Sequence, residues 1–143
     1  MRRRFSTSLC VLALAGLAAS ARADERELDA KLECEPAAGA GRIRCALKVT
    51  APAGARLAWV DALIVKTPPF ARALRTRISH QAAANQSQAE LLLGLVASGE
   101  GNGELAVRAR AVVCPLDEKV GRCRARSRLE TLALKVGASP PAP

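Results

Sequence analysis

Aromatic residues and histidine are scarce in this chain of 143 residues. It has no tyrosine, one tryptophan (Trp59), two phenylalanines and one histidine (His80). Enzymes perform much of their acid-base chemistry with histidine and tyrosine, and proteins that bind single-stranded nucleic acid stack bases on aromatic rings. The composition therefore favours a non-enzymatic protein and argues against a nucleic-acid partner.

Familiar site motifs are missing as well. No group of cysteine, histidine and carboxylate residues has the spacing of metal ligands. The sequence also lacks a glycine-rich phosphate loop and a nucleophile elbow. We expect no cofactor and no metal ion, and we expect the lone His80 to be an ordinary surface residue.

An apolar run long enough to anchor the chain in a membrane is absent, but a shorter run lies near the N-terminus. Three arginines at positions 2–4 precede an apolar stretch at 9–19, and Ala21-Arg22-Ala23 follows. This order predicts a signal peptide that is cleaved after Ala23, and hence a periplasmic or secreted protein without a membrane anchor. Cys10 lies inside the apolar stretch instead of at its end, which argues against a lipidated cysteine.

The mature chain that this cleavage predicts is moderately basic. Cleavage removes four arginines and no acid, so the formal net charge falls from +9 to +5. Such a surplus is sufficient for solubility and favours a polyanionic partner only weakly. The remaining residues suffice for one domain, with a core of Leu, Val, Ile and Ala. We assign 24–137 to this domain and 138–143 to a disordered tail.

The clearest pattern in the chain lies between residues 27 and 49. Apolar residues alternate with charged ones on both sides of a Pro- and Gly-rich turn, which predicts two strands with one buried face. Folding the chain back at this turn places Leu32 opposite Leu47. The same register brings Cys34 opposite Cys45. Because the apolar register and the cysteine pairing agree independently, a disulfide-bonded hairpin is predicted.

A longer apolar strand is predicted from Leu57 to Val65. Both of its faces are apolar, which indicates a central strand covered on both sides. Asp61 interrupts the run and needs a partner, for which an arginine is the expected choice. Beyond the two prolines that end this strand, the pattern over 70–79 favours a short helix or an irregular crossing. A short edge strand is the alternative, since it would suit Leu74, Thr76 and Ile78.

Three more strands are predicted, at about 89–97, 105–113 and 123–136. The Gly-rich run at 99–103 is typical of a hairpin turn. In the last strand, arginines at even positions give way to leucines and a valine at even positions. We interpret this as a change of face at a β-bulge near Leu129 to Thr131. Seven or so short strands predict an all-β sandwich of two sheets.

The order of Cys45, Trp59 and Cys114 resembles the Cys, Trp, Cys order of immunoglobulin-like domains. The resemblance implies an immunoglobulin-like sandwich and raises a rival disulfide pairing, Cys45 with Cys114 and Cys34 with Cys123. The tyrosine expected two residues before the second cysteine of such a domain is absent here. We therefore prefer the local pairs, in which Cys114 bonds to Cys123.

The region from Leu105 to Cys114, followed by Cys123 and the strand to Val136, is similar to the end of one particular immunoglobulin-like domain. This is the N-terminal domain of periplasmic thiol:disulfide interchange proteins. The resemblance implies a redox role for the two cysteines, and the charge of Arg122 and Arg124 would favour a thiolate. The longer spacing of the cysteines and the lack of shielding aromatic residues depart from that family. Structural disulfides are the preferred interpretation.

Arginines near the C-terminus form the second candidate site. Arg108 and Arg110 lie on one predicted strand, and Arg124, Arg126 and Arg128 lie on the next. On a shared face they would suit phosphate or an anionic glycan, although a solvated strand face is the simpler interpretation. The sequence thus predicts a non-enzymatic exported binding or structural module with an envelope or extracellular protein as its partner. A thiol-disulfide redox domain and a polyanion-binding protein are the alternatives.

Overall fold

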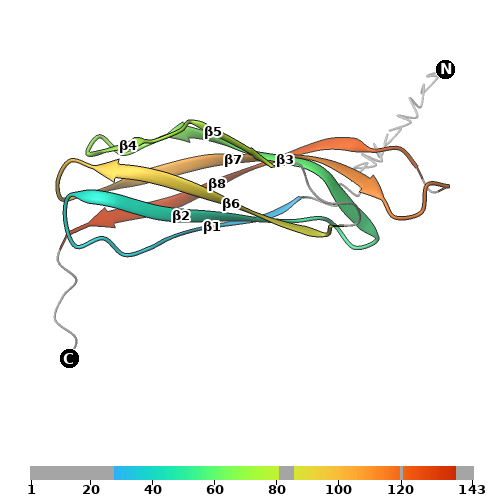
Figure 1. Cartoon of the computed structure of the whole chain (residues 1–143), viewed down its shortest axis with the longest axis horizontal. Helices are drawn as coiled ribbons and strands as arrows, with labels where there is room; N and C mark the ends of the chain where they lie inside the picture. Colours follow the sequence, from blue (N-terminus) through green and yellow to red (C-terminus); the bar gives the residue numbers. More distant parts are fainter. Residues whose placement is uncertain (1–27, 81–85, 120, 138–143) are drawn as a thin grey trace, which may run out of the picture.

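Two four-stranded antiparallel sheets pack face to face in the computed structural model, which describes residues 28–80, 86–119 and 121–137 (Figure 1). Sheet A has the strand order β1-β2-β6-β4, and sheet B has the order β5-β3-β7-β8. The strands are β1 (Asp29–Cys34), β2 (Gly41–Thr50), β3 (Ala55–Lys66), β4 (Ala71–Ala73), β5 (Arg77–His80), β6 (Gln88–Ala97), β7 (Gly101–Pro115) and β8 (Arg124–Val136).

This architecture is the all-β, immunoglobulin-like sandwich that the sequence predicts. The predicted leader at 1–23 and the predicted tail at 138–143 lie outside the described residues.

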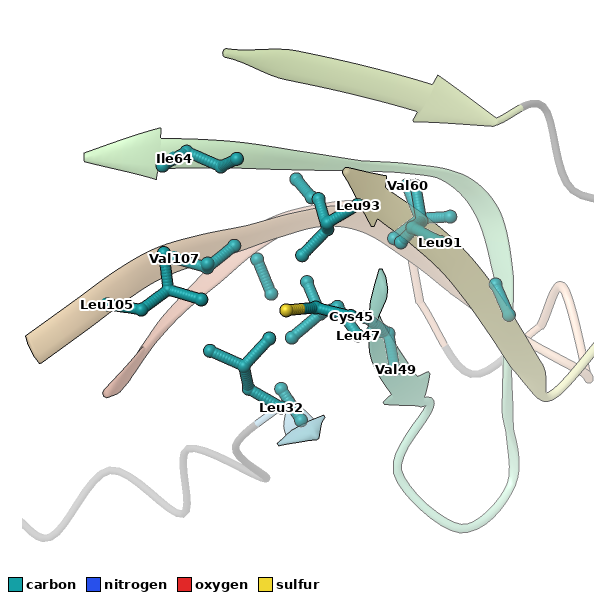
Figure 2. Close-up of a cluster of buried hydrophobic side chains, with 14 of the residues drawn as sticks. Leu32, Cys45, Leu47, Val49, Val60, Ile64, Leu91, Leu93, Leu105 and Val107 are labelled. Carbon is teal, nitrogen blue, oxygen red and sulfur yellow. The ribbon is translucent and has the colours of Figure 1, made fainter. Parts of the chain in front are cut away.

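The core lies between the two sheets and is aliphatic, as the composition predicts. Strands of both sheets alternate between buried and exposed residues, so that every second side chain enters the core. Figure 2 shows these side chains converging from both sheets. A fully buried Leu or Val contributes about 1.5–3 kcal/mol through removal of apolar surface from water. The largest fully buried aliphatic side chains are Leu28, Leu47, Leu57, Leu91, Leu95, Leu105, Val49, Val60 and Val107.

The predicted register of the first hairpin is confirmed. Leu32 lies opposite Leu47, and Cys34 lies opposite Cys45, in the antiparallel pair β1–β2. Strand β2 also pairs with β6 along its whole length, so β2 lies inside sheet A and β1 forms the edge of that sheet.

Strand β3 is central in sheet B, as predicted, but the prediction that both its faces are covered is wrong. Val60, Ala62 and Ile64 face the core and are buried. On the other face Val65 is 46 % exposed, and Trp59 and Leu63 are only half-buried. The reason is that this outer face carries no third layer among the described residues, so its apolar residues are shielded only by neighbouring side chains.

The helix expected near 70–79 is also wrong, because the chain forms two short edge strands there. β4 pairs with β6, and β5 pairs with β3, so the segment crosses from one sheet to the other. The alternative edge strand is correct for Ile78, which lies opposite Ala62. Pairing with the open edges of β6 and β3 thus determines the structure of this segment, in spite of the helical spacing of its apolar residues.

The Gly-rich run at 99–103 is not a hairpin turn, since it connects β6 of sheet A to β7 of sheet B. Its glycines serve packing instead. A Cβ atom on Gly101 would lie 2.4 Å from Cδ1 of Phe70, and one on Gly103 would lie 2.6 Å from Cβ of Pro68. The two glycines therefore make room for Phe70 and Pro68 at this end of the sandwich.

The β-bulge predicted near Leu129 to Thr131 is absent as well. Strand β8 pairs with β7 in one unbroken register from Val136 to Arg124. All even positions of β8 consequently lie on the inner side, the arginines with the leucines. The prediction failed because it assumed that every inner position must be covered by the opposite sheet.

Candidate functional site

The first disulfide joins Cys34 of β1 to Cys45 of β2, as predicted, with 3.9 Å between their Cα atoms. The amide of Glu35 donates a hydrogen bond to the carbonyl of Arg44, so the two cysteines form the closer, non-hydrogen-bonded kind of cross-strand pair. Cys45 is 2 % exposed and belongs to the core. The bond is therefore a staple within the sandwich.

The second disulfide joins Cys114 to Cys123, which rules out the rival pairing of Cys45 with Cys114. Cys114 lies near the end of β7, and Cys123 directly precedes β8. Because Val113 lies opposite Arg124, the two cysteines continue the register of the hairpin by one residue. Cys114 is 3 % exposed, whereas Cys123 is exposed.

The five arginines of the predicted anion site do not share one face. Arg124, Arg126 and Arg128 lie opposite Val113, Ala111 and Ala109, which all face the core. Directly opposite residues of an antiparallel pair point to the same face, so these three arginines lie on the inner side of β8. Arg108 and Arg110 alternate with those core residues and lie on the outer side of sheet B.

A groove accompanies the inner-side arginines. It has a volume of about 470 Å³ and lies between the β2–β3 turn and the start of β8. Pro52 and Gly54 line one wall, and Arg122, Arg124 and Arg126 line the other. Nε of Arg128 donates a hydrogen bond of 2.7 Å to Glu130 Oε1, the next inner-side residue of β8. This end of the sandwich is thus open and basic.

The outer face of sheet B carries an ion cluster centred on Asp61, which is fully buried. Arg110 lies directly opposite Asp61 and donates both from Nε to Oδ1, at 2.8 Å, and from a terminal nitrogen to Oδ2. Arg77 of β5 donates from Nε to Oδ2 at 2.8 Å. Its guanidinium carbon lies 6.0 Å from the centre of the Trp59 ring. The prediction of an arginine partner for Asp61 is confirmed.

The cluster ties three strands of sheet B together, because Asp61, Arg77 and Arg110 come from β3, β5 and β7. The hydrogen bonds and the charge of Asp61 raise the pKa of Arg110 above its ordinary value. Arg110 is therefore engaged in structure and is poorly placed to bind an external anion. Arg108, two residues away, is exposed.

Two features escaped the sequence analysis. Arg77 is not among the predicted site residues, because the pattern over 70–79 favours a short helix or an irregular crossing in place of a strand beside Asp61. A second groove, of about 720 Å³, runs between the end of β1 and the end of β8 and is lined by Cys34, Pro36 and Leu132, among others. The parallel bridge between Ala37 and Val136 lies at this end. No sequence pattern indicates this groove, because the groove depends on how the edge strands β1 and β8 of the two sheets meet.

The described residues contain no group of three or more His, Cys, Asp and Glu side chains that could hold a metal ion. His80 ends β5, opposite Val60. Within 28–80, 86–119 and 121–137, no helix is long and apolar enough to cross a membrane.

Comparisons with known proteins assign no family to this chain. No model of a protein family matches the chain, and no curated protein matches it. Among solved structures, the chain is similar to the ASH / PapD-like domain of human CEP192, PapD-like domain 7, at a TM-score of 0.44 and 9 % sequence identity. The alignment covers 96 % of this chain and 100 % of that one.

Proposed function

We propose that this protein is a non-enzymatic binding or structural module of the periplasm or the extracellular space, exported by a signal peptide cleaved after Ala23. The observation that carries the proposal is the placement of the disulfides. Both join directly opposite positions of an antiparallel hairpin, as staples do. Such bonds form and persist in oxidising compartments, where the expected partner is an envelope or extracellular protein.

A redox role for Cys114 and Cys123 is the alternative. It is suggested by the sequence resemblance to thiol:disulfide interchange proteins. One observation favours it, since Cys123 is exposed and Arg122 and Arg124 line the adjacent groove. Burial of Cys114 opposes it, because disulfide exchange needs an accessible sulfur in line with the attacking thiolate.

A thiol assay separates these two functions. We expect the native mature protein to show no free thiol with Ellman's reagent and to leave the rate of insulin reduction by dithiothreitol unchanged. The variant C114A/C123A is the test protein, and C34A/C45A is the matched control. Acceleration of insulin reduction that disappears only in C114A/C123A would establish the redox function instead.

Export is tested separately. The mature protein recovered from the periplasm or the medium should begin at Asp24 by N-terminal sequencing. Retention of residues 1–23 would contradict the proposed export.

The polyanion-binding alternative is weakened by the placement of the arginines. Arg108 and Arg110 lie on the outer face of sheet B, and the three arginines of β8 lie on its inner side. Because the five arginines lie on two sides of sheet B, a polyanion would meet either the inner-side group or the outer-side group.

A further inference from the structure

The outer face of sheet A carries exposed arginines where β2, β6 and β4 lie side by side (Figure 1). Arg42 of β2 and Arg72 of β4 both lie directly opposite Val96 of β6, one on each side of it. Directly opposite residues of an antiparallel pair point to the same face. Because the neighbouring residues Ile43 and Leu95 enter the core, these arginines point outward. Two strand spacings, about 10 Å, separate them across the sheet.

Apolar side chains occupy the next outward positions of the same strands. Gly94 of β6 lies opposite Arg44 of β2, which is also exposed. A Cβ atom on Gly94 would lie 2.8 Å from Cδ1 of Leu74, so the side chain of Leu74 covers this glycine. Leu92, the next outward residue of β6, is 72 % exposed, more than any other large apolar side chain among the described residues. We define the sheet A patch as the outward residues Arg42, Arg44, Arg72, Leu74, Leu92 and Val96.

The arginines of the sheet A patch have no acidic partner within the part of the chain that the structure describes. Neither a hydrogen bond nor an ion pair joins Arg42, Arg44 or Arg72 to a carboxylate there. Glu35 follows β1, and its backbone amide donates a hydrogen bond of 2.8 Å to the carbonyl of Arg44, but the two side chains form no ion pair. Three uncompensated cations close together create a positive potential that attracts an anionic group.

The β1 side of the same face is electrically balanced. Lys31 Nζ lies 2.7 Å from Glu33 Oε1, and Lys48 Nζ lies 3.7 Å from Glu33 Oε2. Lys48 also lies directly opposite Glu90 of β6. A broad anionic surface such as a bilayer would meet these acids together with the patch and would be repelled by them. A narrow acidic ligand that is confined to the patch avoids them, so the charge pattern favours a protein segment over a membrane surface.

A small pocket adjoins the patch and gives it shape. It has a volume of about 150 Å³ and is lined by Phe70, Arg72, Val96 and Ser98, among others. The amide and the hydroxyl of Ser98 donate hydrogen bonds of 2.8 and 3.1 Å to the carbonyl of Phe70, which fixes this wall to the end of β6. The lining joins apolar surface to a guanidinium group. An apolar side chain next to a carboxylate therefore fits both parts of it.

We propose that the sheet A patch binds a segment of a partner protein that presents an apolar side chain flanked by Asp or Glu. The inference rests on the proposed function as a binding module and names its binding surface and its partner class. The carboxylates of the segment pair with the arginines in charge-assisted hydrogen bonds. The apolar side chain packs on Val96 at the pocket, and the segment removes Leu92 from water.

Peptide binding to the mature, oxidised protein tests the proposal. The probe is a short peptide in which one leucine is flanked on each side by two glutamates, and the readout is the backbone amide NMR shifts of the protein. We expect shifts confined to β2, β4 and β6. R42T/R44T/R72T should bind about tenfold or more weakly, because the charge-assisted pairs are lost. The control K66T/K119T/K135T removes the same charge from exposed positions on other elements and should bind within about twofold of wild type.

The apolar part of the patch has its own matched pair of variants. Leu92→Ser should weaken binding about fivefold or more, because apolar surface that the peptide buries is removed. Leu116→Ser changes another exposed leucine, directly after β7, and should leave binding unchanged. All the substituted side chains are exposed, so urea unfolding of these variants should stay close to that of wild type.

Altered probes separate the possible outcomes. A peptide with serine in place of leucine should bind about fivefold more weakly, and one with glutamine in place of every glutamate about tenfold more weakly. Equal binding of the serine peptide would reduce the interaction to charge attraction and overturn the proposal. The absence of binding by the leucine peptide at about 1 mM would overturn it as well.

Phosphatidylglycerol vesicles provide the competing ligand. Vesicle binding that is lost in R42T/R44T/R72T, without binding of the leucine peptide, would assign the sheet A patch to a membrane surface instead. Insulin reduction and N-terminal sequencing do not involve the patch. Failure of peptide binding is therefore distinguishable from failure of the proposed function.

Discussion

The hairpins β1–β2 and β7–β8 use the same covalent device in different settings. Each hairpin pairs an edge strand, β1 or β8, with an inner strand, and each disulfide has one buried cysteine, Cys45 or Cys114. The other cysteines differ, because Cys34 is half-buried against the core whereas Cys123 is exposed. The first disulfide reinforces a register that apolar packing already specifies, whereas the second closes a hairpin end whose inner side is basic. We therefore expect the Cys34–Cys45 bond to contribute mainly to the stability of the core, and the Cys114–Cys123 bond to hold the surface at the start of β8 in place.

The largest effect is expected at Asp61, which joins β7 of the second hairpin to β3 and β5 of sheet B. Asp61→Ala should lower the free energy of unfolding by about 3 kcal/mol, because a buried carboxylate with two arginine partners is lost. The matched control is Glu104→Ala, which removes an exposed carboxylate paired with Lys66 and should cost about 0.5 kcal/mol. Urea unfolding followed by circular dichroism measures both values. Similar costs for the two variants would show that the ion cluster does not anchor β7.

The first disulfide is expected to have the next largest effect. C34A/C45A should lower the free energy of unfolding by about 2–3 kcal/mol, because a short closed loop is released in the unfolded chain. All strands should be affected alike in hydrogen exchange, since β1 and β2 belong to the cooperative core.

The second disulfide sharpens the comparison. The bond Cys114–Cys123 closes a loop of similar length. We nevertheless expect C114A/C123A to cost only about 1 kcal/mol, because without the bond the start of β8 frays while the core stays folded. Hydrogen exchange should accelerate at the amides near Arg124 and Arg126 and stay unchanged in β2. Equal costs for the two disulfides, with uniform exchange, would remove the distinction between the hairpins.

The smallest effect concerns the exposed face of the first hairpin. Lys31 Nζ lies 2.7 Å from Glu33 Oε1, and its hydrogen bond and charge lower the pKa of Glu33 below the ordinary value of 4.5. A lowered pKa in the folded state stabilises the protein above pH 4.5, and the contribution is lost as the pH falls below that value. Glu33→Gln should therefore unfold slightly more easily than wild type at pH 7, by a difference that shrinks as the pH falls below 4.5. A difference that does not shrink with falling pH would point to another cause.

The sequence predicts some of these features from local patterns and misses others that depend on how the sheets meet. The register of Cys34 and Cys45 follows from strict alternation, and the arginine partner of Asp61 follows from the cost of an unpaired buried charge. The faces of β8 were misjudged, because apolar and basic residues share one inner side when the opposite sheet covers only part of it.

Two further misses have the same origin. The glycines at 99–103 were read as a turn, although they make room for Phe70 and Pro68 from another segment. The pattern over 70–79 favours a short helix or an irregular crossing, although the segment instead forms two short strands on the open edges of β6 and β3. Contacts between distant segments decide both cases, and a local pattern does not contain them.

The central claim is that both disulfides are structural parts of a binding module. Mass-spectrometric mapping of Cys34–Cys45 and Cys114–Cys123 during treatment with dithiothreitol at increasing urea tests it most directly. We predict that both bonds stay closed while the sandwich is folded and open together across the unfolding transition. Rapid, selective opening of Cys114–Cys123 in the folded protein would contradict the claim.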